Sequence, residues 1–209
     1  MKILDLFSGT GSVEKVALKL GHSVISLDIS DKLGTPTIQV DIMKWNYRTF
    51  SPGEFDVIFA GVPCQAYSNL QVLNKSPEGR ASDIEKSNIL VKRTLKIVNY
   101  FKPRAWFIEN PESGCLKDQA FMKNLPYYRI SYCKYGFPYR KNTIIWTNLI
   151  GFKAKRCKFD CDQLDESGRR HVNAIGIRSG QAQKRTSRIQ EKYSYPPELI
   201  EEVLNLASM

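Results

Sequence analysis

The stretch KILDLFSGTGSVEKVALKLGHSVISLD, residues 2–28, decides the fold. It begins and ends with short apolar runs that are typical of buried strands. Between them, VEKVALKLG has the apolar spacing of a helix that ends at Gly21. Gly9 and Gly11 lie where the first strand would turn into this helix. The order of strand, glycine turn, helix and strand predicts one unit of a parallel sheet with crossover helices.

The same alternation continues to about residue 148. A long helix is expected over residues 84–101, where Val91, Leu95 and Val98 recur at helical spacing and should face the sheet. Further strands are expected at 37–40, 56–61, 105–110, 128–136 and 143–148, the last two as an antiparallel pair. The sequence therefore predicts an α/β fold with a doubly wound, mostly parallel sheet.

Two changes of pattern divide the rest of the chain. Over residues 149–190 no amphipathic period persists, as in a disordered basic loop or a small irregular lobe. Residues 191–209 then contain YPPELIEEVLNLA, whose prolines suit the first turn of a helix that must pack on the sheet. We expect a main domain of residues 1–148, a small basic segment of residues 149–190, and a C-terminal helix that returns to the main domain.

The composition is that of a globular protein, with 42% hydrophobic and 25% charged residues. No apolar run approaches the roughly 20 residues that span a bilayer, and the N-terminus does not resemble a signal peptide. Five cysteines, an odd number, argue against a disulfide framework. We therefore expect a soluble, intracellular protein with no membrane partner.

The formal charge of +10 is unevenly distributed along the chain. Residues 1–70 hold six Lys/Arg and seven Asp/Glu, a net of −1, which leaves +11 for the rest. Residues 140–188 alone hold 12 Lys/Arg and four Asp/Glu, a net of +8. Such a concentrated excess favours a polyanionic partner such as nucleic acid, although a solvated basic surface explains the charge equally well.

Acidic residues end the second and third expected strands. Asp28 lies 17 positions beyond Gly11, where a carboxylate can accept hydrogen bonds from ribose hydroxyls. Asp41 could hold an exocyclic amine. No Gly-Lys-Ser/Thr follows the two glycines, so this turn is not a P-loop. The pattern favours a nucleoside-bearing cofactor without a pyrophosphate, such as S-adenosylmethionine, and the alternative is two surface acids at strand–helix turns.

A single thiol follows the fourth expected strand in FDVIFAGVPCQAYS, residues 55–68. Gly61 and Pro63 set a rigid turn there, so Cys64 would be fixed by the backbone and exposed to a substrate, as a nucleophile requires. Cys64 could instead be a small buried hydrophobe. The next strand ends at Glu109 in FIENP, and carboxyl ends of neighbouring parallel strands share one edge of a sheet. A thiol and a carboxyl group in one pocket make a reactive pair.

Taken in order, these motifs resemble those of the C5-cytosine methyltransferases. The match is collinear over roughly residues 1–148: DLFSGTGS resembles the family's first motif, LDIS its second, VDI its third, GVPCQAYS its fourth, FIENP its sixth and YGFPYRKNT its eighth. The short chain looks most like the versions carried by phages and large DNA viruses. The resemblance implies a Rossmann-like, S-adenosylmethionine-dependent fold in which residues 149–190 form a small irregular target-recognition lobe.

The resemblance also implies DNA (cytosine-5)-methyltransferase activity on a cytosine that is flipped out of the duplex. Cys64 would attack C6, Glu109 would hold N3 and the exocyclic amine, and C5 would take the methyl group from S-adenosylmethionine. The cofactor contacts implied by the family's motifs are Phe7, Gly9, Gly11, Asp28, Ile29, Asp41, Ile42 and Pro63.

Two features depart from the family's pattern. Its eighth motif places a glutamine and two arginines where this sequence has Tyr139, Lys141 and Thr143. Arg140 and Lys141 are therefore the candidates for the positive charge at the catalytic site. The Gly-Asn pair of the family's tenth motif is absent before YPPELIEEVLNLA.

By the same resemblance, residues 68–87 would form a loop that closes over DNA. A recognition segment of about 40 residues would read a short sequence, such as the dinucleotide CpG. The expected partner is double-stranded DNA, bound by a monomer in the cytoplasm or a host nucleus. The candidate DNA-binding residues are Ser68, Arg80, Arg140, Lys141, Arg169, Arg170 and His171.

A second group of cysteines lies in CKFDC, residues 157–161, and His171 follows it after nine intervening residues. Cys157, Cys161 and His171 are one ligand short of a closed zinc site, for which Cys133 is an available fourth. We predict no metal at the functional site, with Cys133 and Cys115 as packing residues.

Other functions stay open at this point. The same chemistry on tRNA is compatible with the motifs, and a catalytically weak DNA-binding protein could retain the cofactor pocket. A nicotinamide dehydrogenase would explain the glycines and Asp28, but neither GVPCQAYS nor FIENP.

Overall fold

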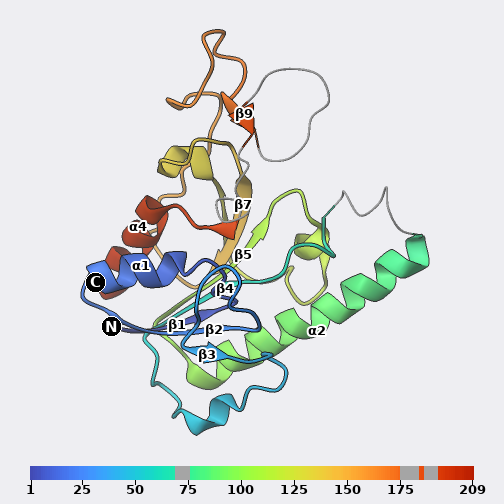
Figure 1. The fold of residues 1–209 in the computed structure, drawn as a ribbon, viewed down its shortest axis with the longest axis vertical. Helices are drawn as coiled ribbons and strands as arrows, with labels where there is room; N and C mark the ends of the chain where they lie inside the picture. Colours follow the sequence, from blue (N-terminus) through green and yellow to red (C-terminus); the bar gives the residue numbers. More distant parts are fainter. Residues whose placement is uncertain (69–75, 175–183, 186–192) are drawn as a thin grey trace.

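A seven-stranded sheet forms the centre of the computed structural model, which describes residues 1–68, 76–174, 184–185 and 193–209 (Figure 1). The strand order is β3-β2-β1-β4-β5-β7-β6. The strands are β1 (Lys2–Leu6), β2 (Ser23–Asp28), β3 (Ile38–Gln39), β4 (Val57–Gly61), β5 (Ala105–Pro111), β6 (Tyr127–Ser131) and β7 (Asn142–Thr147). The first five strands in this order, from β3 across the sheet to β5, pair in parallel. Strand β7 pairs antiparallel with both β5 and β6. The predicted mostly parallel α/β sheet is confirmed.

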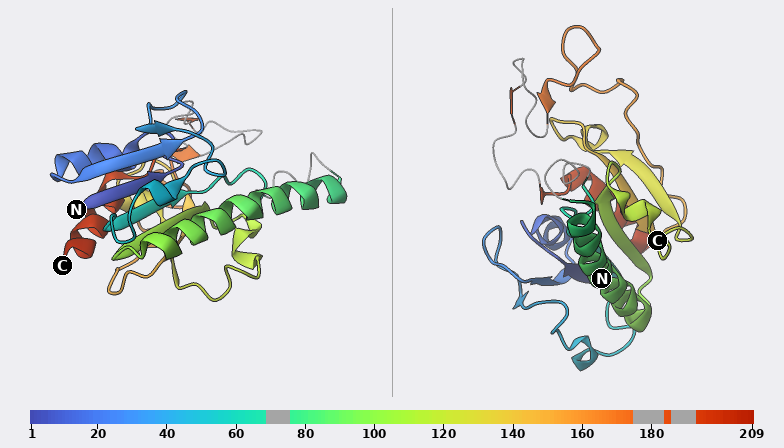
Figure 2. Two further views of the ribbon diagram at one scale, coloured as in Figure 1. Left: turned by 90° about the horizontal axis from the view of Figure 1, so that it is seen from below. Right: turned by 90° about the vertical axis from the view of Figure 1, so that its right-hand side faces the viewer.

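Helices cover both faces of this sheet, as the doubly wound prediction requires (Figures 1 and 2). The helices are α1 (Ser12–Lys19), α2 (Pro77–Phe101) and α4 (Pro197–Ser208). In β1, Ile3 packs in a core with α1 and α4, whereas Leu4 packs in the opposite core with α2. Val91, Leu95 and Val98 of α2 belong to that second core, as predicted. Because both faces are buried, the strands read as continuous apolar runs.

Helix α2 begins earlier than the sequence predicts. The sequence analysis places a helix at residues 84–101 and a DNA-closing loop at residues 68–87, but α2 already begins at Pro77. The Ser76 hydroxyl caps it by accepting a backbone N–H of the first turn at 3.2 Å, and a proline at the first helical position has no N–H to satisfy. The loop prediction is therefore wrong over its second half, and its segment 69–75 lies outside the described residues.

The last two strands form the predicted antiparallel pair, with Ser131 opposite Asn142. The strand expected at residues 128–136 stops at Ser131, because the chain turns into a short 3-10 helix, η4 (Tyr132–Tyr135), that ends at a left-handed Gly136. Strand β7 also pairs with β5, with Thr143 opposite Pro111. The turn before β7 is thereby brought to the carboxyl end of β5.

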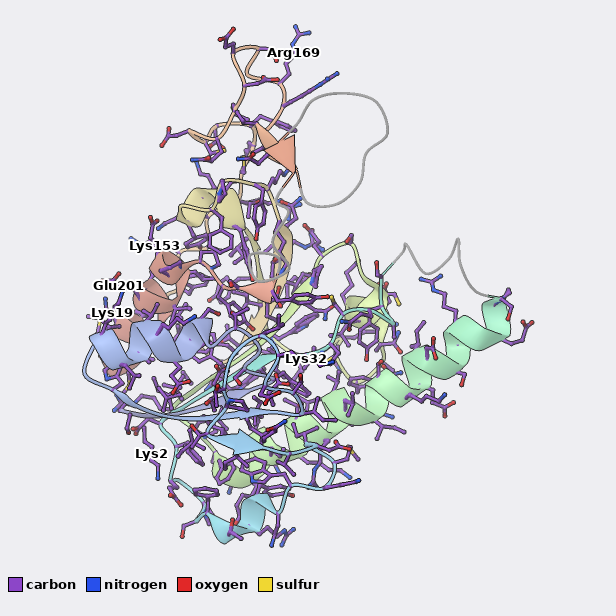
Figure 3. All side chains as sticks on the ribbon, viewed as in Figure 1. Lys2, Lys19, Lys32, Lys153, Arg169 and Glu201 are labelled. Carbon is purple, nitrogen blue, oxygen red and sulfur yellow. The ribbon has the colours of Figure 1, made fainter. Side chains whose placement is uncertain are left out.

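Irregular chain extends beyond the sheet in residues 157–174, with Arg169 projecting at its far end (Figure 3). This part includes β8 (Asn173–Ala174), which pairs in parallel with β9 (Lys184–Arg185). A bridge between Tyr139 and Asn173 ties it to the turn before β7. A third of the predicted basic segment lies outside the described residues, and the division of the chain at residues 148 and 190 stays a prediction. Within the described ranges, no helix is both long and apolar enough to cross a membrane.

Candidate active site

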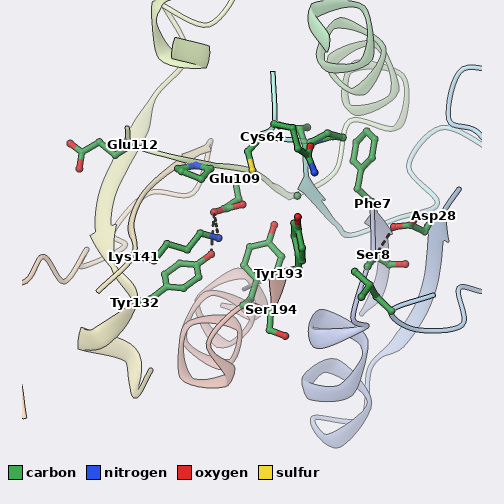
Figure 4. Close-up of a pocket in the computed structure, with 18 of the residues that line it drawn as sticks. Phe7, Ser8, Asp28, Cys64, Glu109, Glu112, Tyr132, Lys141, Tyr193 and Ser194 are labelled. Atoms are coloured by element: carbon green, nitrogen blue, oxygen red, sulfur yellow. Dashed lines mark hydrogen bonds and ion pairs between the residues drawn. The ribbon is translucent and has the colours of Figure 1, made fainter. Parts of the chain in front are cut away.

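A cavity of ≈ 1060 Å³ opens where the parallel strands end (Figure 4). Its walls come from the segments after β1, β2, β4 and β5, from the turn before β7, and from residues 193–195 ahead of α4. Ligands of open α/β sheets bind at this edge. The volume is at the upper end of ordinary ligand sites, about 300–1,000 Å³, so it has room for more than one small group.

Cys64 stands at the wall of this cavity, three residues beyond the last residue of β4. The turn that carries it is held from both sides: the Asn110 amide donates to the Val62 carbonyl at 3.2 Å, and the Tyr67 N–H donates to the Cys64 carbonyl at 3.1 Å. The Tyr67 ring is buried, and its hydroxyl donates to Asn88 at 2.9 Å. The thiol is therefore fixed by backbone, as the sequence predicts for a nucleophile.

The electrostatic surroundings of Cys64 keep it a thiol at rest. Burial raises the pKa of Cys64 above its ordinary value, the negative charge of Glu109 raises it further, and the positive charge of Lys141 opposes the rise. A thiolate is the reactive form of cysteine. The three side chains thus form one electrostatic unit in which Lys141 favours the nucleophilic state.

Glu109 lies at the end of β5, next to β4, with 8% of its surface exposed. Its Oε1 atom receives two contacts: the Lys141 Nζ lies 3.2 Å away, and the Tyr132 hydroxyl donates to it at 3.2 Å. Figure 4 shows both side chains pointing at the Glu109 carboxylate from the same wall. A buried carboxylate held by an ammonium and a phenol is positioned to accept a hydrogen bond from a bound base.

The opposite wall is formed by the segment that leads into α4. The Tyr195 N–H donates to the Ser12 hydroxyl at 3.1 Å, and the Thr10 and Ser194 hydroxyls lie 3.1 Å apart, so the segment is bonded to the start of α1. Burial raises the pKa of Tyr195 well above its ordinary value, and its hydroxyl has no hydrogen-bond partner among the described residues. The ring packs closely over Gly61, leaving no space there for a side chain.

The cofactor end of the cavity is organised around Asp28. One of its carboxylate oxygens accepts the Gly9 N–H at 2.9 Å, and the other accepts the Ser30 N–H at 3.0 Å. Phe7 and Gly9 both have positive φ angles, which bends the backbone around the acid. A carboxylate has about four lone-pair sites, so Asp28 keeps acceptors for ribose hydroxyls. These residues fit a nucleoside-bearing cofactor.

The comparisons with known proteins agree with this site. The family model "C-5 cytosine-specific DNA methylase" matches residues 1–122. A Frog virus 3 (isolate Goorha) protein named "Probable DNA (cytosine-5)-methyltransferase" is 36% identical over 221 residues, which cover 99% of this chain and 100% of the viral protein. The chain belongs to the C-5 cytosine-specific DNA methylase family.

Two longer proteins share parts of this methylase chain. The type II methyltransferase M.HpaII of Haemophilus parainfluenzae is 28% identical over 115 residues, 51% of this chain and 30% of the bacterial protein. The crystal structure of a candidate DNA modification methyltransferase encoded within an E. coli prophage matches with a TM-score of 0.53 and 19% identity, over 70% of this chain and 46% of that one. This last likeness supports the fold alone. The predicted family and fold are confirmed, and family membership implies a methyl donor.

Most, but not all, of the predicted cofactor residues of the methylase reach the cavity. Those that line it are Phe7, Gly9, Asp28, Ile29 and Pro63. Gly11 instead precedes α1 as its N-cap, and the Asp41 carboxylate accepts the Met43 N–H at 2.9 Å outside the lining. The Ile42 side chain is 4% exposed within the core under α2, so it is not available to a ligand in the cavity.

Sequence reasoning missed two residues of the site, Tyr132 and Tyr195. Tyr132 contacts Glu109 only because β7 inserts between β5 and β6, so that η4 returns to the cavity. Tyr195 lies within YSYPP, ahead of the last helix. The two aromatic residues before the prolines were the sequence signal that could have indicated a place in the site. Both positions depend on contacts between distant parts of the chain.

The predicted DNA-binding residues lie in different surroundings. Arg140 donates to Asn142 at 3.2 Å and covers the Phe159 ring at 4.8 Å. Arg169 and Arg170 are exposed. Arg80 lies in the first turn of α2. Ser68 is the last described residue before the gap at residues 69–75. The DNA contacts of these residues, and of Lys141, stay predictions.

His171 differs from the other predicted DNA contacts because it is only 7% exposed. Its ring faces Cys157 and Cys161, not solvent, which argues against the predicted contact with DNA. Cys133, predicted to be a packing residue, joins the same group. The burial expected for Cys133 is confirmed, and the four residues that the sequence offered as a possible zinc site do lie together.

Proposed function

We propose that the protein is a DNA (cytosine-5)-methyltransferase that uses Cys64 as its nucleophile and S-adenosylmethionine as its methyl donor. One observation carries the proposal: Cys64, Glu109 with Lys141, and Asp28 line a single cavity in a chain of the C-5 cytosine-specific DNA methylase family. The reaction requires these three parts: a nucleophilic thiol, a carboxylate that binds the base, and an acid that binds the cofactor.

The side chains of the cavity have separate tasks. Cys64 loses its proton and forms a bond from its sulfur to C6 of a cytosine that has left the duplex stack. The electron pair displaced from the ring's double bond makes C5 nucleophilic, and Glu109 binds N3 and the exocyclic amine while charge develops there. When bound, S-adenosylmethionine supplies an electrophilic methyl group. C5 then loses its proton to a base or water, and the C6–S bond breaks to return Cys64.

Lys141 supplies the positive charge that the family's eighth motif otherwise takes from arginine. It lies 3.2 Å from the Glu109 carboxylate, and it opposes the rise in the pKa of Cys64. Tyr132 holds the same carboxylate oxygen. We expect Lys141 and Tyr132 to position Glu109 before the base enters, and Arg140 to contact the phosphate backbone or the cytosine carbonyl oxygen.

Double-stranded DNA is the proposed partner of the basic part of the chain. Residues 140–188 carry a net charge of +8, from 12 Lys/Arg and four Asp/Glu, and Arg169 is exposed far from the cavity. Positive charge contributes mainly phosphate contacts, so a small recognition segment supports a short recognition sequence. We expect a monomer that acts in the cytoplasm or a host nucleus, wherever its DNA lies.

Transfer of a labelled methyl group tests the proposal. The protein is incubated with labelled S-adenosylmethionine and with either duplex DNA or tRNA. Label should enter duplex DNA with the wild type and with Cys115→Ala, a matched change of a partly buried cysteine outside the cavity. It should not enter with Cys64→Ala. Transfer that survives Cys64→Ala would overturn the mechanism, and transfer to tRNA alone would overturn the substrate.

A further inference from the structure

Three cysteines and a histidine meet beside the active-site wall. Cys133 comes from η4, Cys157 and Cys161 come from the CKFDC turn, and His171 comes from the following loop. Their three sulfur atoms and one ring nitrogen all lie within 4.8 Å of one another. Cys133, Cys157 and His171 are buried, and Cys161 is partly buried. None of the four residues has a part in the proposed methyl transfer.

Three separations among these atoms are close to those between the ligands of a tetrahedral metal ion. The Cys157 and Cys161 sulfurs lie 3.7 Å apart, and the His171 Nε2 lies 3.4 Å from the first and 3.3 Å from the second. Around a tetrahedral zinc, bonds of about 2.3 Å to sulfur and about 2.0 Å to nitrogen give roughly 3.8 Å between sulfurs and roughly 3.6 Å between sulfur and nitrogen. These three separations agree to within a few tenths of an ångström, and the Cys133 sulfur lies within 4.8 Å of the other three atoms. A disulfide requires about 2.05 Å, so the two sulfurs are not bonded to each other.

The CKFDC turn, which carries two of the four residues, is held in a fixed conformation. Phe159 has a φ of 63°, a left-handed conformation that is uncommon for a residue with a side chain. The Lys158 N–H donates to the Asp160 carboxylate at 2.8 Å within this turn. Lys134 holds the turn from outside, with its Nζ 2.9 Å from the Asp160 carbonyl and 3.3 Å from the Asp160 carboxylate. The turn therefore holds the Cys157 and Cys161 sulfurs on the same side, 3.7 Å apart.

We propose that Cys133, Cys157, Cys161 and His171 bind one zinc ion in a closed structural site. Three thiolates and one imidazole complete a tetrahedron, so no open position is left for a substrate or water, as a catalytic zinc would need. Soft sulfur ligands favour zinc over magnesium or calcium. The inference rests on the positions of these four residues and not on the proposed function.

The zinc ion holds the recognition part of the chain against the catalytic wall. Cys133 follows Tyr132, whose hydroxyl donates to Glu109, whereas the other three ligands belong to the irregular segment beyond the sheet. Besides these ligands, the Ser131 hydroxyl accepts the Cys157 N–H at 3.1 Å, and Tyr139 forms a bridge to Asn173. The ion adds to these contacts a cross-link between η4 and the irregular segment, in the way that structural metals stabilise small domains.

Metal content of the full-length protein tests the proposal. Untagged protein is purified without chelators, and its zinc is measured by elemental analysis alongside its free thiols. One zinc per chain is expected in the wild type and in Cys115→Ser, a matched cysteine change outside the cluster. Cys161→Ser and His171→Ala should lower zinc affinity more than about tenfold. Wild-type protein without stoichiometric zinc, a Cys157–Cys161 disulfide in that protein, or full zinc content in the ligand variants would overturn the proposal.

Cobalt replacement keeps the test decisive if a ligand variant fails to fold. The wild type is stripped of metal under reducing conditions and titrated with Co²⁺. A closed site with three sulfurs and one nitrogen predicts the visible bands of tetrahedral cobalt together with intense thiolate charge-transfer absorption, and added zinc should abolish both. Octahedral cobalt spectra, or no saturable binding, would contradict the site. Neither readout depends on methyl transfer, so failure of the zinc site and failure of the proposed function are distinguishable.

Discussion

Lys141 lies 3.2 Å from Glu109, and the two charges act on the pKa of Cys64 in opposite directions. Glu109 raises it, and Lys141 lowers it. Burial already raises the pKa of the Cys64 thiol. The free protein therefore holds Cys64 mainly protonated at neutral pH. In the proposed mechanism, a bound cytosine that engages Glu109 would release Lys141 to stabilise the thiolate, and activation of Cys64 would then be linked to binding of the base.

Loss of the Lys141 charge should make Cys64 less reactive. Without the ammonium, nothing at that position opposes the effects of burial and Glu109, so the pKa of Cys64 rises and its alkylation profile moves to higher pH. Lys141→Met should therefore show slower alkylation of the Cys64 peptide at neutral pH, measured by mass spectrometry. Lys153→Met, an exposed lysine distant from the cavity lining, should behave as the wild type. Lys141→Arg should restore the profile; a profile unchanged in Lys141→Met would refute the coupling.

Neutralising Glu109 should separate thiol reactivity from catalysis. Glu109→Gln removes a negative charge that raises the pKa of Cys64, so alkylation should become faster and begin at lower pH. Methyl transfer should nevertheless fall by about 10²–10⁴, because the base loses its hydrogen-bonding partner. Glu54→Gln is the matched control, since Glu54 pairs with Lys2 and lies outside the cavity lining. Parallel changes in alkylation and transfer would contradict the role given to Glu109.

Asp28 should determine cofactor affinity. Its carboxylate organises the Gly9 turn and offers acceptors to ribose hydroxyls, so Asp28→Ala should weaken binding of S-adenosylmethionine by more than about tenfold, equivalent to about 1.4 kcal/mol. Isothermal titration calorimetry measures this directly. Asp31→Ala, an exposed acid three residues later, should leave the affinity unchanged. Equal affinities in wild type and Asp28→Ala would remove Asp28 from the site.

The contact between Gly61 and Tyr195 should not tolerate a side chain. A Cβ atom at Gly61 would lie 2.9 Å from the Tyr195 hydroxyl, so Gly61→Ala must displace the segment that closes the cavity. We expect a loss of about 1–3 kcal/mol in unfolding free energy, measured by denaturant titration. Gly79→Ala, on α2, should be neutral or stabilising by up to about 1 kcal/mol. A stability as high as that of the wild type in Gly61→Ala would show that Tyr195 moves freely.

The sequence was sufficient for those parts of the fold that depend on local pattern. Ile3 and Leu4 face opposite cores, and this two-sided burial explains the apolar runs from which the parallel strands were predicted. Cys64 and Glu109 were predictable as neighbours because each ends a strand at the same edge. Pro77 was the exception, since its polar surroundings hid a capped helix start.

Positions set by long-range contacts were not predictable in this way. Tyr132 reaches Glu109 only through the insertion of β7 next to β5, and Tyr195 reaches Gly61 only because α4 returns to the sheet. Ile42 was expected at the cofactor on the basis of its motif, yet its side chain is in the core. Cys133 was available as a fourth ligand, but it lies 24 positions before Cys157, so spacing along the chain alone could not place it beside the CKFDC turn.

Trapping of the covalent intermediate tests the central claim most directly. The protein and S-adenosylmethionine are incubated with duplexes that carry 5-fluorocytosine in randomised sequence contexts, so that the recognition sequence need not be known. Fluorine at C5 cannot leave as a proton does, and the C6–S bond therefore persists. We expect a denaturation-resistant protein–DNA adduct whose modified peptide contains Cys64, present in Cys115→Ala and absent in Cys64→Ala. Methyl transfer to normal DNA with no adduct at Cys64, or an adduct at another residue, would contradict the account.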